Sequence, residues 1–126
     1  MAEAGWAPNA IGGLTLGADP VAYAIALASR QNPPEIDAFT VRKEPKGHGT
    51  GQRVEGGFQQ GHRVVIVEDV ITTGGSALKA VEAVFEQGGH ILGVLAVIDR
   101  EEGGRAAIEA AGFPVRAMIL ASELMR

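Results

Sequence analysis

The feature that most constrains this chain is an apolar run that ends in two acids and a glycine-rich turn, over residues 64–76. Its first four residues are all β-branched and apolar, without polar alternation. Such a run is typical of a strand buried on both faces inside a parallel sheet. The apolar spacing over residues 77–85 predicts a helix after the turn. We therefore expect a strand, a turn and a helix, with Glu68 and Asp69 at the end of the strand.

The turn has the composition of a phosphate site, and the acids before it restrict the kinds of ligand that could bind there. Residues 72–76 offer backbone N–H groups, hydroxyls and the positive end of a helix dipole. Glu68 and Asp69 would repel a bare phosphate, so the ligand must also bring hydroxyl donors or a divalent cation. A sugar phosphate with Mg²⁺ meets both conditions, because the acids can accept hydrogen bonds from vicinal ribose hydroxyls. Neither a P-loop nor a dinucleotide motif is present, and ordinary loop chemistry is the alternative.

Length and composition restrict the class of protein. The chain has 126 residues, which predicts a single domain over residues 1–126. A net charge of -4 argues against a nucleic-acid partner or a membrane surface. Cysteine is absent, so disulfides, thiolate metal sites and a cysteine nucleophile are excluded. No apolar stretch reaches the length of a membrane span and no signal peptide is recognised, so the expected location is cytoplasmic.

The remaining pattern alternates strands with helices in the order βαβαβ, which predicts an α/β fold with a parallel sheet and ligands at the carboxyl ends of its strands. Residues 12–18 are expected to form a loop, with Asp19 as N-cap and Pro20 at the first helical position. The expected helices cover residues 21–30, 77–87 and 104–111, and the expected strands cover residues 37–42, 63–68, 90–98 and 115–120, with a weak strand at 53–55.

A basic segment at residues 42–51 stands out in an otherwise acidic chain. Arg42, Lys43, Lys46 and His48 fall within seven residues, and glycines surround and follow the histidine. Such a segment can close over an anion and bring cationic groups to leaving-group oxygens. The alternative is a solvated basic hairpin that protects a sheet edge. Because the same chain also contains the sugar-phosphate turn, we favour the first interpretation.

Residues 64–76 resemble the phosphoribosyl-diphosphate (PRPP) signature of the type I phosphoribosyltransferases. The resemblance implies a Rossmann-like parallel-sheet core with helices on both faces. It also implies that Glu68 and Asp69 hold the ribose hydroxyls. The 5'-phosphate would be held by Thr72, Thr73, Gly74, Gly75 and Ser76.

Two further segments are similar to those of orotate phosphoribosyltransferases: the loop at residues 42–51 and the Asp-Arg-Glu-Glu-Gly-Gly segment at residues 99–104. The resemblance implies transfer of ribose 5-phosphate from PRPP to orotate in UMP biosynthesis, with Mg²⁺ as cofactor and a homodimer that shares its active sites. Arg100 would pair with orotate. Lys43, Lys46, His48 and Asp69 would be catalytic, Arg42 would bind substrate, and no residue is assigned as a metal ligand.

The chain departs from this family in two places. Almost nothing precedes Gly12, where family members carry an N-terminal hood over the base, so we expect a domain truncated on that side. Residues 13–18 resemble the diphosphate-contacting loop, but Leu16 stands where many members have lysine. Three alternatives stay open: a PRPP-binding regulatory module, a catalytically incomplete module, and a phosphoribosyltransferase acting on another base, such as a purine.

Overall fold

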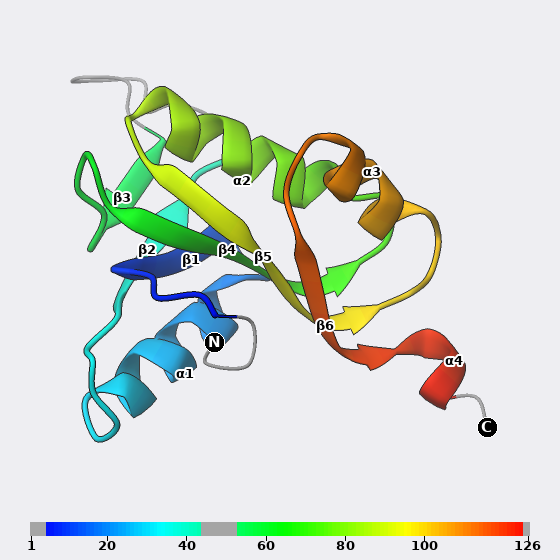
Figure 1. Ribbon diagram of the computed structural model, residues 1–126, viewed down its shortest axis with the longest axis horizontal. Helices are drawn as coiled ribbons and strands as arrows, with labels where there is room; N and C mark the ends of the chain where they lie inside the picture. Colours follow the sequence, from blue (N-terminus) through cyan, green and yellow to red (C-terminus); the bar gives the residue numbers. More distant parts are fainter. Residues whose placement is uncertain (1–4, 44–52, 125–126) are drawn as a thin grey trace.

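The computed structural model describes residues 5–43 and 53–124. Within these ranges the chain forms strands and helices that alternate for most of its length (Figure 1). The strands are β1 (Ala10–Leu14), β2 (Asp37–Val41), β3 (Val54–Gly56), β4 (Arg63–Ile71), β5 (His90–Asp99) and β6 (Val115–Leu120). The helices are α1 (Asp19–Ser29), α2 (Gly75–Glu86), α3 (Gly104–Ala110) and α4 (Ala121–Leu124).

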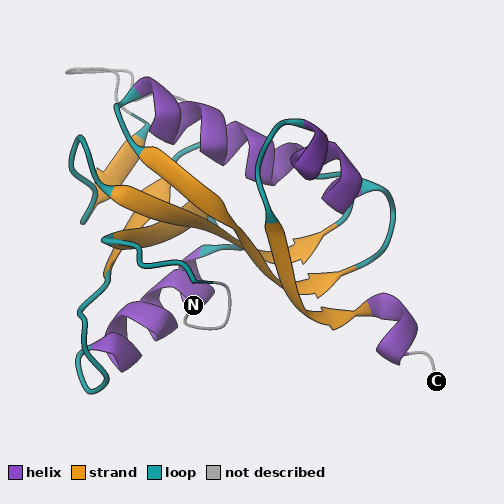
Figure 2. Cartoon of the chain, viewed as in Figure 1, coloured by secondary structure: helices purple, strands orange, loops and turns teal. Residues whose placement is uncertain are grey.

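The strands form one sheet in the order β3-β2-β1-β4-β5-β6 (Figure 2). All neighbours are parallel except β2 and β3, which pair antiparallel. The exception is β3, which follows β2 in the sequence and pairs with it at the edge of the sheet. The predicted α/β fold with a mainly parallel sheet is confirmed, and the weak strand near residue 54 forms the antiparallel edge.

Helices cover both faces of the sheet, as expected. Helix α1 lies on one face, and α2 and α3 lie on the other (Figure 1). Two apolar clusters fill the two interfaces. The cluster beneath α1 is built on Ile11, Ala18, Ala22, Val65 and Val67. The larger cluster beneath α2 and α3 includes Val64, Ile66, Ala80, Val84, Val94 and Ile108, among others. Alternate residues of β4 therefore face opposite layers, which explains its continuous apolar run.

The expected loop at residues 12–18 is wrong in its first part, because Ala10–Leu14 forms the fully buried strand β1. Glycine is depleted in strands, so Gly12 and Gly13 hide the signal. Their packing shows why glycine stands there. A Cβ on Gly12 would collide with the carbonyl oxygen of Phe39, and one on Gly13 with that of Val67. The strand can sit between β2 and β4 only because these positions carry no side chain.

The expected N-cap of α1 is also wrong by one residue. Ala18 occupies the cap position, α1 begins at Asp19, and no side chain caps the helix. The Asp19 carboxylate instead accepts a hydrogen bond from the hydroxyl of Thr15 at 2.7 Å. Pro20, predicted at the first helical position, is the second residue of α1.

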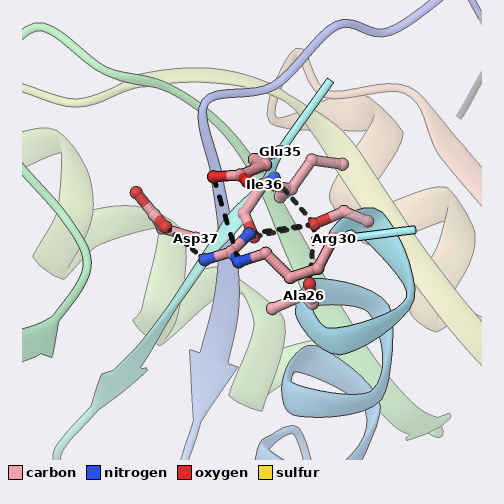
Figure 3. A network of polar contacts seen from close by, with 6 residues as sticks. Ala26, Arg30, Glu35, Ile36 and Asp37 are labelled. Atoms are coloured by element: carbon pink, nitrogen blue, oxygen red, sulfur yellow. Dashed lines mark hydrogen bonds and ion pairs between the residues drawn. The ribbon is translucent and has the colours of Figure 1, made fainter. Parts of the chain in front are cut away.

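A polar network closes the connection between α1 and β2 (Figure 3). The buried hydroxyl of Ser29 accepts from the backbone N–H of Ile36 at 2.9 Å and donates to the carbonyl of Ala26 at 2.6 Å. The guanidinium of Arg30 donates to the carbonyl of Ile36 at 3.1 Å and to Asp37 at 2.9 Å. These contacts fix the start of β2 on the end of α1.

The topology fixes where a ligand can bind. From β1 the sheet grows through β2 and β3 on one side, and through β4, β5 and β6 on the other. The direction of growth reverses between β1 and β4, and ligands of open α/β sheets bind beyond the carboxyl ends of strands at such a switch point. A ligand is therefore expected at the segments that follow β1 and β4. Within the described ranges, none of the helices has the length and apolarity needed to cross a membrane.

Candidate functional site

The turn between β4 and α2 surrounds a pocket at the carboxyl end of β4. Helix α2 begins at Gly75, and Gly74 caps it with a φ of 90°, a left-handed conformation that favours glycine. The first backbone N–H groups of α2 have no partner within the helix, so they and the helix dipole favour an anion. The lining residues are Glu68, Val70, Ile71, Thr72, Thr73, Gly74, Gly75, Ser76 and Ala77.

Glu68 brings a buried carboxylate into the same pocket. Glu68 is 5 % exposed, and its Oε1 atom has no hydrogen-bond partner among the described residues. Burial, and secondarily the charge of neighbouring Asp69, raises the pKa of Glu68 from 4.5 to about 7. A buried polar atom without a partner is costly and calls for an explanation. A ligand hydroxyl that donates to this oxygen would supply one.

Asp69 lies on the other face of the strand and is exposed. Successive side chains of a strand point to opposite faces of the sheet. The side chain of Glu68 therefore lies on the face of β4 that carries α2, and that of Asp69 lies on the face that carries α1. Its Oδ1 atom accepts from the backbone N–H of Val70 at 2.8 Å. A Cβ built on Gly17 would lie 2.8 Å from the same oxygen, so the β1–α1 loop crosses directly beside Asp69. The two acids thus flank the end of β4 from both faces.

The segment between β5 and α3 packs against the phosphate-type turn. A Cβ on Gly104 would collide with the carbonyl oxygen of Thr72 and would lie 2.8 Å from the backbone nitrogen of Gly74. The backbone N–H of Arg100 also donates to the carbonyl of Ile71 at 3.0 Å. The turns after β4 and β5 are therefore in direct backbone contact. Neither can move far without the other.

Hydrogen bonds hold the same segment from its far side. The buried carboxylate of Asp99 accepts from the backbone N–H of Glu101 at 2.8 Å. Glu101, at a φ of 61°, accepts from the backbone N–H of Ser122 at 2.7 Å. That hydrogen bond lowers the pKa of Glu101. The Arg100 side chain is exposed, and its Nε lies 2.9 Å from the carboxylate of Glu102. Arg100 is not among the residues that line the Glu68 pocket.

Only the first two residues of the predicted basic loop are described. Arg42 and Lys43 are exposed just beyond β2, whereas Lys46 and His48 lie outside the described residues. Arg42 pairs with Glu55 at 3.2 Å. The guanidinium of Arg53 donates to the carbonyls of Arg42 and Lys43 at 3.2 and 3.3 Å. These contacts join the start of the loop to β3 and to the residue before β3.

The structure thus brings together at one pocket Glu68 and the five residues of the predicted phosphate turn. Asp69 lies at the same strand end, on the β1–α1 loop side. Sequence reasoning missed the bonds that Thr15 and Thr40 donate to Asp19. The only signal for that region was the resemblance of residues 13–18 to a diphosphate loop, since the contact depends on strands that are distant in sequence.

Comparison with known proteins shows where such a site occurs. Residues 4–122 match the family described as the phosphoribosyl transferase domain. The chain is 56% identical over 118 residues to an orotate phosphoribosyltransferase of Aquifex aeolicus, covering 94% of this chain and 64% of the relative. The corresponding enzyme of Rhodopirellula baltica is 50% identical over 116 residues, covering 92% and 60%. The chain therefore spans less than two thirds of the length of these relatives.

Solved structures agree with the sequence comparison. The orotate phosphoribosyltransferase of Mycobacterium tuberculosis, solved with Fe(III) dicitrate, superposes with a TM-score of 0.88 at 48% identity, covering 98% of this chain and 69% of that one. The same enzyme in complex with PRPP gives a TM-score of 0.84 at 46% identity, covering 96% and 68%. Sequence, fold and pocket agree, and the chain belongs to the family of phosphoribosyl transferase domains.

Proposed function

We propose that this chain is an orotate phosphoribosyltransferase, which transfers ribose 5-phosphate from PRPP to orotate and yields orotidine 5'-phosphate and diphosphate in UMP biosynthesis. The observation that carries the proposal is the unpartnered, buried Oε1 atom of Glu68, which shares its pocket with the N-terminal turn of α2. One pocket thus offers an acceptor for a sugar hydroxyl and donors for a phosphate. Relatives about half identical to this chain are named orotate phosphoribosyltransferases.

The residues of the pocket divide the binding of PRPP between them. In the proposed complex, backbone and hydroxyl groups of Thr72, Thr73 and Ser76, with the backbone of Gly74 and Gly75, hold the 5'-phosphate. Glu68 and Asp69 accept hydrogen bonds from the ribose hydroxyls. Because Asp69 lies beside Gly17, the β1–α1 loop would lie next to the sugar in this complex, where the diphosphate of PRPP begins.

Mg²⁺ is the cofactor that we propose. No group of three potential ligands among His, Asp and Glu occurs within residues 5–43 and 53–124, so these parts of the chain contain no closed protein cage. The exposed carboxylate of Asp69 nevertheless fits a hard cation that keeps waters and shares phosphate oxygens with a substrate. When bound, the ion would neutralise charge on the departing diphosphate.

Catalysis needs no protein nucleophile in this scheme. Positive charge develops on the ribose as the diphosphate leaves, and Asp69 lies at the strand end where that charge would form. Arg42 binds the diphosphate, and Lys43, Lys46 and His48 neutralise it as it departs. The guanidinium of Arg100 offers a planar fork that matches the carboxylate of orotate. It must exchange its contact with Glu102 for the substrate.

The proposed assembly is a homodimer with shared active sites. The support for it is the segment at residues 42–51, which resembles the loop that enters a neighbouring subunit's site in this family. Sedimentation in the presence of PRPP and Mg²⁺ measures the mass directly. A species of one chain that turns over at full rate would contradict the shared site.

Diphosphate release tests the function. The purified chain is mixed with PRPP, Mg²⁺ and orotate, with adenine and xanthine in parallel reactions. We expect release with orotate alone, and a loss of release in Arg100→Ala, with Arg116→Ala on β6 as the control for an exposed arginine elsewhere on the protein. Release with a purine instead would reassign the acceptor. PRPP binding without release from any base would identify a binding module.

A further inference from the structure

We infer that Asp19 is a positioning residue that holds the β1–α1 loop beside Asp69, in the geometry that receives PRPP. The inference rests on the proposed PRPP site and adds to it a residue that does not itself line the pocket at the end of β4. Asp19 is at the start of α1, immediately after the loop that crosses Asp69 at Gly17.

The carboxylate of Asp19 links two segments that meet only in the folded chain. Its Oδ2 atom accepts from the hydroxyl of Thr15 at 2.7 Å, at the start of the loop. Its Oδ1 atom accepts from the hydroxyl of Thr40 on β2 at 3.2 Å. The hydroxyl of Tyr23 lies 3.0 Å from that of Thr40. With Thr40 donating to the carboxylate, Tyr23 is the donor in this last pair, and the donors align toward Asp19.

The strand register places this network at the site. Gly13, at the end of β1, pairs with Thr40 on β2, so Thr40 stands beside the point where the loop leaves the sheet. Backbone bonds tie the loop down as well, because Thr15 donates its N–H to the carbonyl of Val41 at 2.9 Å. One carboxylate therefore anchors both the loop next to Asp69 and the strand that leads to Arg42.

Asp19 also lies at the start of a helix, and a role limited to stabilising that helix would give a different result. An acid in the first turn stabilises a helix through the helix dipole, whatever Thr15 contributes. Thr15→Val leaves that charge in place and removes only the bond to the loop, with little change in side-chain size. Thr15→Ser keeps the hydroxyl. The pair separates positioning of the loop from stability of the helix.

The experiment measures PRPP affinity by titration calorimetry with Mg²⁺ present, in the wild type, Asp19→Ala, Thr15→Val and Thr15→Ser. We expect Asp19→Ala and Thr15→Val to weaken PRPP binding about tenfold, the loss typical of one charge-assisted hydrogen bond. Thr15→Ser should bind as the wild type does. The matched control is Asp37→Ala, which removes the same charge from the opposite end of β2, where it holds Arg30.

Hydrogen exchange provides a readout that does not depend on a substrate. The backbone amides of residues 17–19 should exchange faster in Thr15→Val than in the wild type, while those of β4 and β5 stay unchanged. Wild-type PRPP affinity and wild-type exchange in Thr15→Val would overturn the inference. Weakened PRPP binding in Thr15→Val, alongside no turnover of orotate by the wild type, would reject the proposed transfer and still support the role of Asp19.

Discussion

Replacing Glu68 by glutamine should stabilise the protein at neutral and alkaline pH, because the buried carboxylate destabilises the fold when it is ionised. Its pKa rises from 4.5 to about 7 in the folded chain. Each tenfold change in proton affinity is worth about 1.4 kcal/mol, so ionised Glu68 costs the folded state about 3 kcal/mol. The amide of glutamine is itself a buried polar group, which reduces the expected gain to about 2 kcal/mol.

The sign of the pH dependence follows from which state holds the proton. Folded Glu68 keeps its proton to a higher pH than unfolded Glu68, so its contribution to stability is fully present below pH 4.5 and is lost as the pH rises through 7. Glutamine is neutral throughout. Glu68→Gln should therefore exceed the wild type by about 2 kcal/mol at pH 8, and by less than about 1 kcal/mol at pH 5.

Urea unfolding of both proteins at pH 5 and pH 8 measures the free energies. Glu82→Gln, an exposed carboxyl on α2, is the matched control and should follow the wild type at both pH values. An advantage of Glu68→Gln that is equal at the two pH values would show that the gain comes from packing and not from the charge. No advantage at pH 8 would refute the account of a buried, unpartnered carboxylate.

Three further predictions concern the fold, the phosphate turn and the basic loop. Ser29→Ala should lower the free energy of unfolding by about 1–3 kcal/mol in urea titrations, since it leaves the N–H of Ile36 without its acceptor. Gly104→Ala should lower the melting temperature, because the structure has no room for the added methyl group. In Gly75→Ala the methyl group would lie 3.7 Å from its nearest neighbour, so the melting temperature should not change. Because Gly75 lines the pocket, this variant should bind PRPP more weakly in calorimetry. Lys46→Ala should bind ribose 5-phosphate as the wild type does and reduce turnover on the order of 10²-fold in a diphosphate-release assay; unchanged turnover would remove Lys46 from the leaving-group site.

The strands and helices that carry strong local patterns could be predicted from the sequence. The unbroken apolar run of β4 indicated a strand buried on both faces, and β4 lies inside the sheet. Strand β1 could not be found in this way, because Gly12 and Gly13 contribute no side chains to a pattern. They are selected by the backbone atoms of β2 and β4 that they touch, which only the assembled sheet reveals.

In the site, too, local features could be predicted from the sequence, whereas contacts between distant segments could not. Glu68 on β4 and the turn that follows β4 are close together in the sequence, so their common pocket could be predicted from one segment. The contact between Gly17 and Asp69, and that between Gly104 and Thr72, join turns that follow different strands. The bond between Asp19 and Thr40 likewise spans residues that are 21 apart. Such contacts depend on strand order, which local residue patterns do not specify.

Transfer of labelled ribose is the sharpest test of the proposed reaction. PRPP labelled in its ribose is incubated with the purified chain, Mg²⁺ and orotate, and the products are separated by anion-exchange chromatography. We expect label in orotidine 5'-phosphate, in equal amount to the diphosphate released, and no labelled orotidine 5'-phosphate when Glu68 and Asp69 are both replaced by alanine. Label that stays in PRPP with the wild-type chain, although the chain binds PRPP, would contradict the claim that this site carries out the transfer.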